Sequence, residues 1–425
     1  RALAFRVVRA VGVGGFNSLS VGLVVLADQS VLIADHFNGR IRRVTPDGWI
    51  ETWAGRGEFA VDGSGGPAIN AAMRPLDLAV GPDGTVYVLE PNGVRSIEVD
   101  GIIRDVVGPG SQWTEDDDDV PAIGVRLVRT SGIDVGPDGS LYIVHDHRVR
   151  RVGLDGIIRT VAGTGVEGTS PDGTLAIDAD LNEPDDVVVA ADGTVYVSEP
   201  GAARVRRIDT SGILTTVIGD GWREDSGDGG PARDARISGP RYLAIGPDES
   251  LYITTFSGYL RRIDPSGIVS TLAGNGTADR VGDDLCAREV GFSRPAGIGL
   301  RGDQILVADD QHGRIRILTP TDDVSIDPED PEPPSPPTDV RLSIVRNPAH
   351  DRVDMALRLP EASEVRLDVY DARGRHVTTV LEGRRGPGEL RTAWDASKNL
   401  ASGVYHVRLQ VDGRVVGREK VVVLR

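Results

Sequence analysis

The 425-residue chain combines 39% hydrophobic residues with a formal net charge of −17 at pH 7, and it contains a single cysteine, Cys286. That hydrophobic fraction is enough for globular cores, but no apolar run approaches the ~20 residues of a membrane-spanning helix, and one cysteine cannot form an intrachain disulfide. An acidic chain repels phosphate backbones, so the composition argues against nucleic acid as a partner.

A repeat of about 55 residues runs through the first three quarters of the chain. Its marker is an aspartate-containing turn that recurs every 54 to 56 residues, at Asp28, Asp83, Asp138, Asp192, Asp248 and Asp303. After each turn come an alternating apolar run such as TVYVLE (85–90), in most repeats an arginine-rich run such as RVRRI (204–208), and usually a tight Asp-Gly or Ser-Gly turn. Period-two alternation favours strands, and Asp-Gly is typical of hairpins. Four short strands per repeat, six times over, predict an all-β fold with a six-bladed β-propeller.

The two ends of the repeat region complement each other. The stretch RVVRAVGVGG (6–15) resembles GIIRTVAGTG (156–165), which is the last strand of a repeat with the turn that follows it. The sixth repeat, from about residue 295 to residue 319, lacks this last strand. An open ring would leave strand edges exposed. We therefore predict that residues 5–12 complete the sixth blade and close the ring.

The repeat sequences carry a family resemblance. The stretches PDGTVYV, RVRRIDTSGILTTVIGDG and SGDGGPARDA resemble NHL repeats in their bacterial form, with GDGGPA loops between blades. The resemblance covers residues 1–319 and implies a six-bladed β-propeller. Such propellers serve as binding platforms and, less often, as enzymes, so the resemblance does not imply one activity.

The C-terminal part of the chain has a different composition. Residues 320–338 hold seven prolines and six acidic residues, which is typical of an extended, semi-rigid linker. Seven short alternating runs within residues 339–425 predict a β-sandwich. The stretches LDVYDARGRHVTTVLEG and SGVYHVRL resemble the FlgD-type immunoglobulin-like domain and, equally, the C-terminal sorting domains of type IX secretion. The resemblance implies a protein that is secreted or attached to the bacterial cell surface.

A ring of polar residues is a candidate metal or ligand site. The second strand of each repeat ends at one position, and in a propeller these positions surround one end of the central channel: Asp35, Glu90, His145, Glu199, Thr255 and Asp309. Asp77, Asp185 and Asp186 begin inner strands and are expected to reach the same end. Carboxylates and a histidine suit a divalent cation.

The alternative for the same ring is ion pairing within each blade. Three of its acids precede an arginine by five residues, across a predicted hairpin: Asp35 and Arg40, Glu199 and Arg204, Asp309 and Arg314. Glu90 has Val94 at the position taken as equivalent, and His145 is the one histidine of the ring. Glu90 and His145 are therefore the preferred ligand-binding candidates.

Two tryptophans lie in long loops between repeats, on the face that also carries the acidic ring. They are Trp113 in GPGSQWTEDDDD and Trp222 in GDGWREDSGDGG. An exposed tryptophan stacks on sugars or anchors a protein partner; alternatively, each tryptophan covers its own loop. The acidic run 116–119 is interpreted as a solvated loop.

Catalytic motifs are scarce. GTGVEG (163–168) matches a dinucleotide-binding pattern, but equivalent turns recur in other repeats and no helix pattern follows. NHL-type lyases use several histidines around zinc, whereas the repeat region has His36, His145, His147 and His312.

The sequence thus predicts a binding propeller whose ligand, an extracellular protein or glycan, docks on the interblade-loop face. No cofactor is expected to be required, although the acidic ring could hold a divalent cation at the channel mouth. The C-terminal domain is expected to engage secretion or anchoring machinery. The alternatives are a cation-dependent hydrolase or lyase with its site at the channel mouth, and a structural filament or adhesin subunit.

Overall fold

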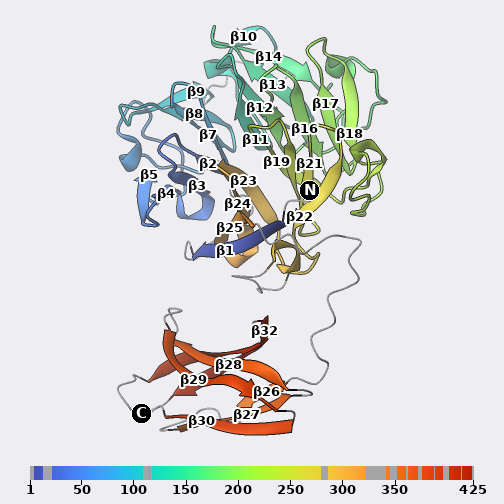
Figure 1. Ribbon diagram of the computed structural model, residues 1–425. Coiled ribbons are helices and arrows are strands. Elements are labelled where there is room, and N and C mark those ends of the chain that lie inside the picture. The colour runs from blue at the N-terminus through green and yellow to red at the C-terminus, as the bar shows by residue number, and fades with distance from the viewer. Residues whose placement is uncertain are drawn as a thin grey trace. The chain divides into compact units, whose positions relative to one another are not determined.

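The computed structural model describes residues 4–12, 22–108, 114, 117–278, 286–321, 341–344, 352–359, 362–371, 376–386, 388–395, 402–412 and 414–423. The chain divides into two compact units, Arg1–Ser325 and Ile326–Arg425, and both are built from antiparallel sheets (Figure 1). Among the described residues, none of the helices has the length and apolar character needed to cross a bilayer.

The first unit is a ring of six blades, each a sheet whose four main antiparallel strands follow one another in order from the central channel to the rim. The first blade consists of β2 (Leu23–Val25), β3 (Val31–Asp35), β4 (Arg40–Val44) and β5 (Ile50–Ala54), and the second of β6 (Asp77–Val80), β7 (Val86–Glu90), β8 (Gly93–Ile97) and β9 (Ile103–Val107). The third consists of β11 (Thr130–Val135), β12 (Leu141–His145), β13 (Arg148–Val152) and β14 (Ile157–Ala162), and the short β10 (Val120–Pro121) pairs with the outer side of β14.

The other three blades follow the same order. The fourth blade consists of β15 (Val187–Val189), β16 (Val195–Glu199), β17 (Arg204–Ile208) and β18 (Leu214–Ile218), and the fifth of β19 (Pro240–Ile245), β20 (Leu251–Thr255), β21 (Leu260–Ile263) and β22 (Val269–Ala273). The sixth consists of β23 (Pro295–Arg301), β24 (Gln304–Asp309), β25 (Arg314–Thr321) and β1 (Ala4–Gly12).

The sixth blade joins the two ends of the ring. β1 pairs antiparallel with β25, from Ala4 opposite Thr321 to Gly12 opposite Arg314, with a bulge between Val7 and Arg9. The sequence-based prediction of closure by residues 5–12 is confirmed, because the N-terminal strand supplies the strand that the last repeat lacks.

Aliphatic side chains pack between successive blades and form the core of the ring. In one such cluster, Leu89 and Val94 of the second blade pack with Ile143 and Ile158 of the third. Alternation along each strand sends one set of side chains into each interface, so the repeat of the sequence becomes a repeat of packed interfaces.

The loops between blades are anchored by short 3-10 turns: η2 (Ala68–Asn70), η3 (Ala122–Gly124), η4 (Ala176–Asp178), η5 (Ala232–Asp234) and η6 (Ala287–Glu289). In the GGPA segments, Pro67 forms an isolated bridge to Ile102 and Pro231 to Ile268. The loop that leaves one blade is therefore attached to the outer hairpin of the next. Two further turns, η1 (His36–Asn38) and η7 (Asp310–His312), lie in the hairpins after β3 and β24.

The second unit contains the seven strands predicted for the tail. One sheet has the order β26 (Arg341–Ile344), β27 (Arg352–Leu359), β30 (Gly388–Asp395), and the other has the order β29 (His376–Arg385), β28 (Ser363–Asp371), β31 (Gly403–Val411), β32 (Arg414–Val423). Both sheets contribute to one buried cluster, to which β27 gives Met355, β28 gives Leu367 and β30 gives Trp394. The first two residues of the predicted linker 320–338 belong to β25, so the sixth blade extends to Thr321 and not to residue 319. Residues 322–340 lie outside the described residues.

Candidate functional site

An arginine occupies one position in the third strand of every blade, and it is buried in five of the six. The register places it opposite the middle of the second strand in each case: Arg42, Arg95, Arg150, Arg206, Arg261 and Arg316. Five of the six, all but Arg42, are at most 2% exposed. A buried charge is costly unless it is paired, so each of these arginines requires acceptors inside the ring.

The interblade loops supply many of these acceptors. Carboxylates of Asp118, Asp172 and Asp228 lie 2.9, 3.1 and 2.8 Å from the guanidinium groups of the arginines that follow them in the next blade, Arg150, Arg206 and Arg261. Asp118 belongs to the acidic run 116–119, interpreted from the sequence as a solvated loop; its side chain is 41% exposed and in addition pairs with Arg150. These aspartates hold each loop onto the following blade, and one of them belongs to the GDGGPA segment.

Glu90 is fully paired, contrary to the expectation that it lacks an arginine. Its carboxylate accepts from Arg95 Nε at 2.6 Å and from Arg95 Nη2 at 2.8 Å, and also from the backbone N–H of Arg74 at 2.7 Å. The hairpin after β7 is two residues shorter than the one after β3. Arg95 is consequently the equivalent of Arg42, and counting to Val94 missed it.

The other acids of the ring have the expected register but different partners. Asp35, Glu199 and Asp309 lie opposite Arg40, Arg204 and Arg314 across their hairpins. The ion pairs, however, join Glu199 to Arg206 at 3.4 Å and Asp309 to Arg316 at 3.0 Å, and Asp35 accepts from Asn38 at 2.7 Å. Alternate residues share a face of a strand, and the arginine two positions further along is the one buried in the blade interface.

His145 is enclosed in the ring and is not a surface ligand. It is 0% exposed, and neither ring nitrogen has a partner among the described residues. Burial, together with the charges of Arg150 and Arg148, lowers the pKa of His145 to about 3, so the imidazole is neutral at physiological pH.

The predicted cation site finds no convergent ligands. Within the described parts of the chain, no three histidine, cysteine, aspartate or glutamate side chains are grouped so that they could hold a metal ion. The five proposed ligands instead have separate surroundings at the ends of the second strands: Asp35, Glu90, His145, Glu199 and Asp309.

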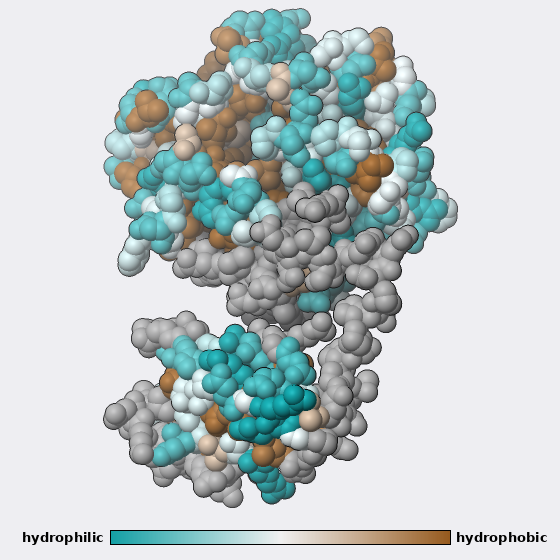
Figure 2. All heavy atoms as spheres, viewed as in Figure 1, coloured by the Kyte–Doolittle hydropathy of each residue, from teal (hydrophilic) through white to brown (hydrophobic). Residues whose placement is uncertain are grey.

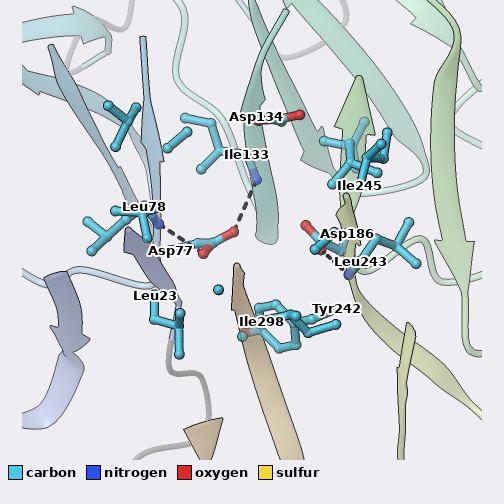
Figure 3. Close-up of a pocket in the computed structure, with 18 of the residues that line it drawn as sticks. Leu23, Asp77, Leu78, Ile133, Asp134, Asp186, Tyr242, Leu243, Ile245 and Ile298 are labelled. Carbon is cyan, nitrogen blue, oxygen red and sulfur yellow. Dashed lines mark hydrogen bonds between the residues drawn. The ribbon is translucent and has the colours of Figure 1, made fainter. Parts of the chain in front are cut away.

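A cavity of about 370 Å³ lies in the central channel, lined by the six inner strands. Figure 3 shows Asp77 and Asp186 pointing into it from opposite sides, with Tyr242 nearby. In the space-filling view the centre of the ring is a hollow with hydrophobic residues around it (Figure 2). The channel therefore combines an apolar wall with a few buried carboxyl groups.

Each channel carboxylate bridges two blades. Backbone N–H groups of the next inner strand donate to Asp77 (from Ile133, 3.3 Å), Asp134 (from Val189, 2.7 Å) and Asp186 (from Leu243, 2.8 Å). Each aspartate thus satisfies a backbone donor on the neighbouring inner strand. The sequence had pointed to Asp77 and Asp186 as starts of inner strands but not to Asp134, whose signal is an acid inside the apolar run GIDVG (132–136).

Burial changes the acidity of these groups. It raises the pKa of Asp77 to about 7 and that of Asp134 to about 6. The pKa of Asp186 is also raised well above its usual value, first by burial and then by the nearby charge of Asp77. Glycines make the space: a Cβ on Gly132 would lie 2.5 Å from an Asp186 carboxylate oxygen, and one on Gly22 would lie 2.0 Å from Asp77.

A second cavity of about 340 Å³, here called the mouth pocket, lies on the interblade-loop face. Its lining comes from residues just before inner strands, from hairpins after second strands and from one interblade loop: Arg129, Ser131, Asp146, His147, Glu167, Glu183, Pro184, Asp185, Pro200, Arg241 and Phe256.

Arg241 is the most buried cation of the mouth pocket. It is 4% exposed, and its Nε donates to Asp185 at 3.2 Å. Its guanidinium carbon lies 4.7 Å from the centroid of the Phe256 ring. Arg241 Nη1 and His147 Nδ1 are buried and have no partner among the described residues. Sequence reasoning missed Arg241 and Phe256; the available signal was a single basic residue at the start of an inner strand, PRYLAI (240–245).

The two loop tryptophans stand apart from this pocket. Trp222 is 67% exposed, with the guanidinium carbon of Arg236 5.7 Å from its ring, and it is not part of the lining of either cavity. Trp113 lies outside the described residues. Their predicted role in ligand binding stays a prediction.

Comparison with known proteins supports the fold. No protein-family model matches the chain. Teneurin-1 of Gallus gallus is 26% identical over 216 residues, which cover 45% of this chain but 8% of teneurin-1, so the chain spans less than a tenth of that relative. A solved structure of a protein of unknown function from Bacteroides thetaiotaomicron has a TM-score of 0.52 at 17% identity, over 75% of this chain and 76% of that one. An auxiliary nutrient-binding protein from Bacteroides ovatus has a TM-score of 0.50 at 14% identity, over 75% and 77% of the two chains. These similarities support a β-propeller with NHL-type repeats.

Proposed function

We propose that this chain is a secreted or cell-surface binding propeller without catalysis, and that its ligand, an extracellular protein or glycan or a smaller fragment of either, docks in the mouth pocket. The observation that carries the proposal is Arg241, a residue that lines this cavity and whose Nη1 is a buried donor without a partner among the described residues. An unsatisfied buried donor costs about 1–3 kcal/mol, and an acceptor on a ligand would recover that free energy. Phe256, 47% exposed beside it, offers an aromatic surface.

The position of the pocket also supports binding. Binding residues tend to lie on loops that a rigid scaffold holds in place, and here the interblade loops are fastened by ion pairs to buried arginines, such as Asp228 to Arg261. The alternative, a cation-dependent hydrolase or lyase, needs ligands that converge at the channel mouth, whereas the ring acids Glu90, Glu199 and Asp309 are each engaged by an arginine.

For the second unit we propose a role in export or anchoring. The support is the resemblance of LDVYDARGRHVTTVLEG and SGVYHVRL to FlgD-type immunoglobulin-like domains and to type IX sorting domains. A separate unit with its own hydrophobic core suits such a role. Deleting residues 339–425 in a bacterium with a type IX secretion system should then abolish surface display while leaving ligand binding by the propeller intact.

The binding proposal is tested with a panel of defined oligosaccharides and short peptides, by thermal shift and then by calorimetry. We expect at least one compound to bind, and Phe256→Ala to weaken that binding by about 1–3 kcal/mol because an anchoring ring is removed. Trp49→Ala is the matched control, since Trp49 is 74% exposed in a turn of the opposite face. Trp222→Ala tests whether the loop tryptophan contacts the same ligand. Loss of binding in Trp49→Ala with normal binding in Phe256→Ala would place the functional face on the other side of the ring.

A further inference from the structure

The mouth pocket offers one directional site for an anionic group. Arg241 uses Nε on Asp185 and leaves Nη1 buried without a partner among the described residues. The rings of Phe256 and Tyr242 lie 4.7 and 5.2 Å from its guanidinium carbon and hold the group in place. A planar guanidinium with an open N–H is suited to bind a carboxylate through charge-assisted hydrogen bonds.

The rest of the lining is acidic. The lining contains two arginines, Arg129 and Arg241, and four carboxylates, those of Asp146, Glu167, Glu183 and Asp185. Its formal charge is therefore −2 when the histidine is not counted. Asp185 pairs with Arg241, and Asp146 lies 3.5 Å from Arg129, whereas Glu167 and Glu183 are exposed carboxylates at the rim. A purely anionic ligand would enter against this field and against the chain's net charge of −17.

A ligand that carries both charges resolves this conflict. We infer that the mouth pocket binds a small zwitterion, a free amino acid or a short peptide, with its carboxylate on Arg241 and its ammonium group toward Glu183. The volume of about 340 Å³ lies at the lower end for small-molecule sites and suits a ligand of this size. Phe256 provides an apolar surface for the ligand's side chain. The inference rests on the proposed function, because it names the ligand class for the same pocket.

Several residues of the pocket have left-handed backbone conformations. Arg129 and Glu183 precede inner strands at equivalent positions and have φ of 49° and 48°, while Gly239 and Arg294 hold that position in the fifth and sixth blades with φ of 59° and 55°. Glycine adopts this left-handed conformation without the steric cost that other residues bear. Strained residues of this kind occur at functional sites, and three of them, Arg129, Asp146 and Glu183, line the pocket.

The test is calorimetric titration of the full chain with the twenty amino acids and the twenty Gly-Xaa dipeptides. We expect saturable one-to-one binding of at least one of them. Its C-terminal amide and its N-acetyl form should each bind at least tenfold more weakly, because each removes one of the two charges.

Variants locate the site. Arg241→Lys keeps the charge but removes the planar fork and should weaken binding at least tenfold; its melting temperature checks that it folds. Glu183→Gln changes an exposed residue and should weaken binding at least fivefold. Glu249→Gln is the matched control, since Glu249 is also exposed and left-handed (φ 64°) but lies in an opposite-face turn, and its binding should equal that of the unaltered chain.

The outcomes separate the inference from the proposed function. If no amino acid or dipeptide binds, or if the blocked forms bind as well as the free ones, the zwitterion assignment is overturned. If oligosaccharides bind instead and Phe256→Ala weakens them, the ligand class is wrong while the binding function stands. Binding that is unchanged in both Arg241→Lys and Glu183→Gln places the site outside the mouth pocket.

Discussion

Three single aspartates link neighbouring blades inside the channel: Asp77, Asp134 and Asp186. Each accepts a backbone N–H from the inner strand of the next blade while its own carboxyl group is buried in the channel. Burial raises the pKa of all three. Between pH 4 and pH 7 the folded chain therefore holds protons that the unfolded chain has released, and ionising these groups weakens the fold.

The sign of the pH dependence follows. Because the folded-state pKa values lie above the unfolded ones, stability from these groups is highest at low pH and is lost as pH rises toward about 7. We expect the contribution of these three groups to the free energy of unfolding to fall by an amount on the order of 2 kcal/mol between pH 5 and pH 8. The lowered pKa of His145 acts in the opposite direction below its unfolded pKa, so the contribution is measured by urea titration as the difference between the unaltered chain and Asp77→Asn. Asp77→Asn should show a smaller fall, whatever its absolute stability. Asp83→Asn, at an exposed turn where hydrogen bonds lower the pKa, should keep the original slope; an equal slope in Asp77→Asn would contradict the assignment.

β1 is the element on which the closure of the ring depends. It covers the outer edge of β25 along its length, from Ala4 opposite Thr321 to Gly12 opposite Arg314. An uncovered strand edge is a template for pairing with another chain. The interblade loops, in turn, are held in place by ion pairs to buried arginines, such as Asp172 to Arg206 at 3.1 Å.

Deleting residues 1–12 should therefore lower the melting temperature by roughly 5 °C or more, because a whole strand of pairing is lost, and should cause aggregation through the bare edge. Differential scanning calorimetry and size-exclusion chromatography measure the two effects. Deleting residues 1–3 alone, which precede β1, is the control and should leave both unchanged. Normal melting of the longer deletion would refute closure by β1.

The whole molecule consists of two units with separate hydrophobic cores. The proline- and acid-rich segment 320–338 lies between them in sequence. Segments of this composition behave as extended spacers, and they are accessible to proteases because they have few groups to bury.

Limited proteolysis should cut within residues 320–338 and leave two resistant fragments, identified by mass spectrometry. Residues 339–425 expressed alone should fold and melt cooperatively, since the buried cluster of that unit is formed by its own two sheets. Simultaneous degradation of both fragments would instead show that the two units stabilise each other.

The sequence by itself determined the six blades, their closure by the N-terminal strand and the seven strands of the tail. These features rest on local signals, alternation and turn residues, which the 55-residue repeat presents six times. The partners of the charged residues were decided only by the tertiary structure. Glu90 meets Arg95 five residues further on, whereas Glu199 meets Arg206 seven residues further on, because the hairpin after β7 is two residues shorter. Arg241 meets Asp185 across 56 positions of sequence. The physical reason is that burial between blades selects which of several similar arginines must be paired, and burial arises only when blades that are distant in sequence pack together.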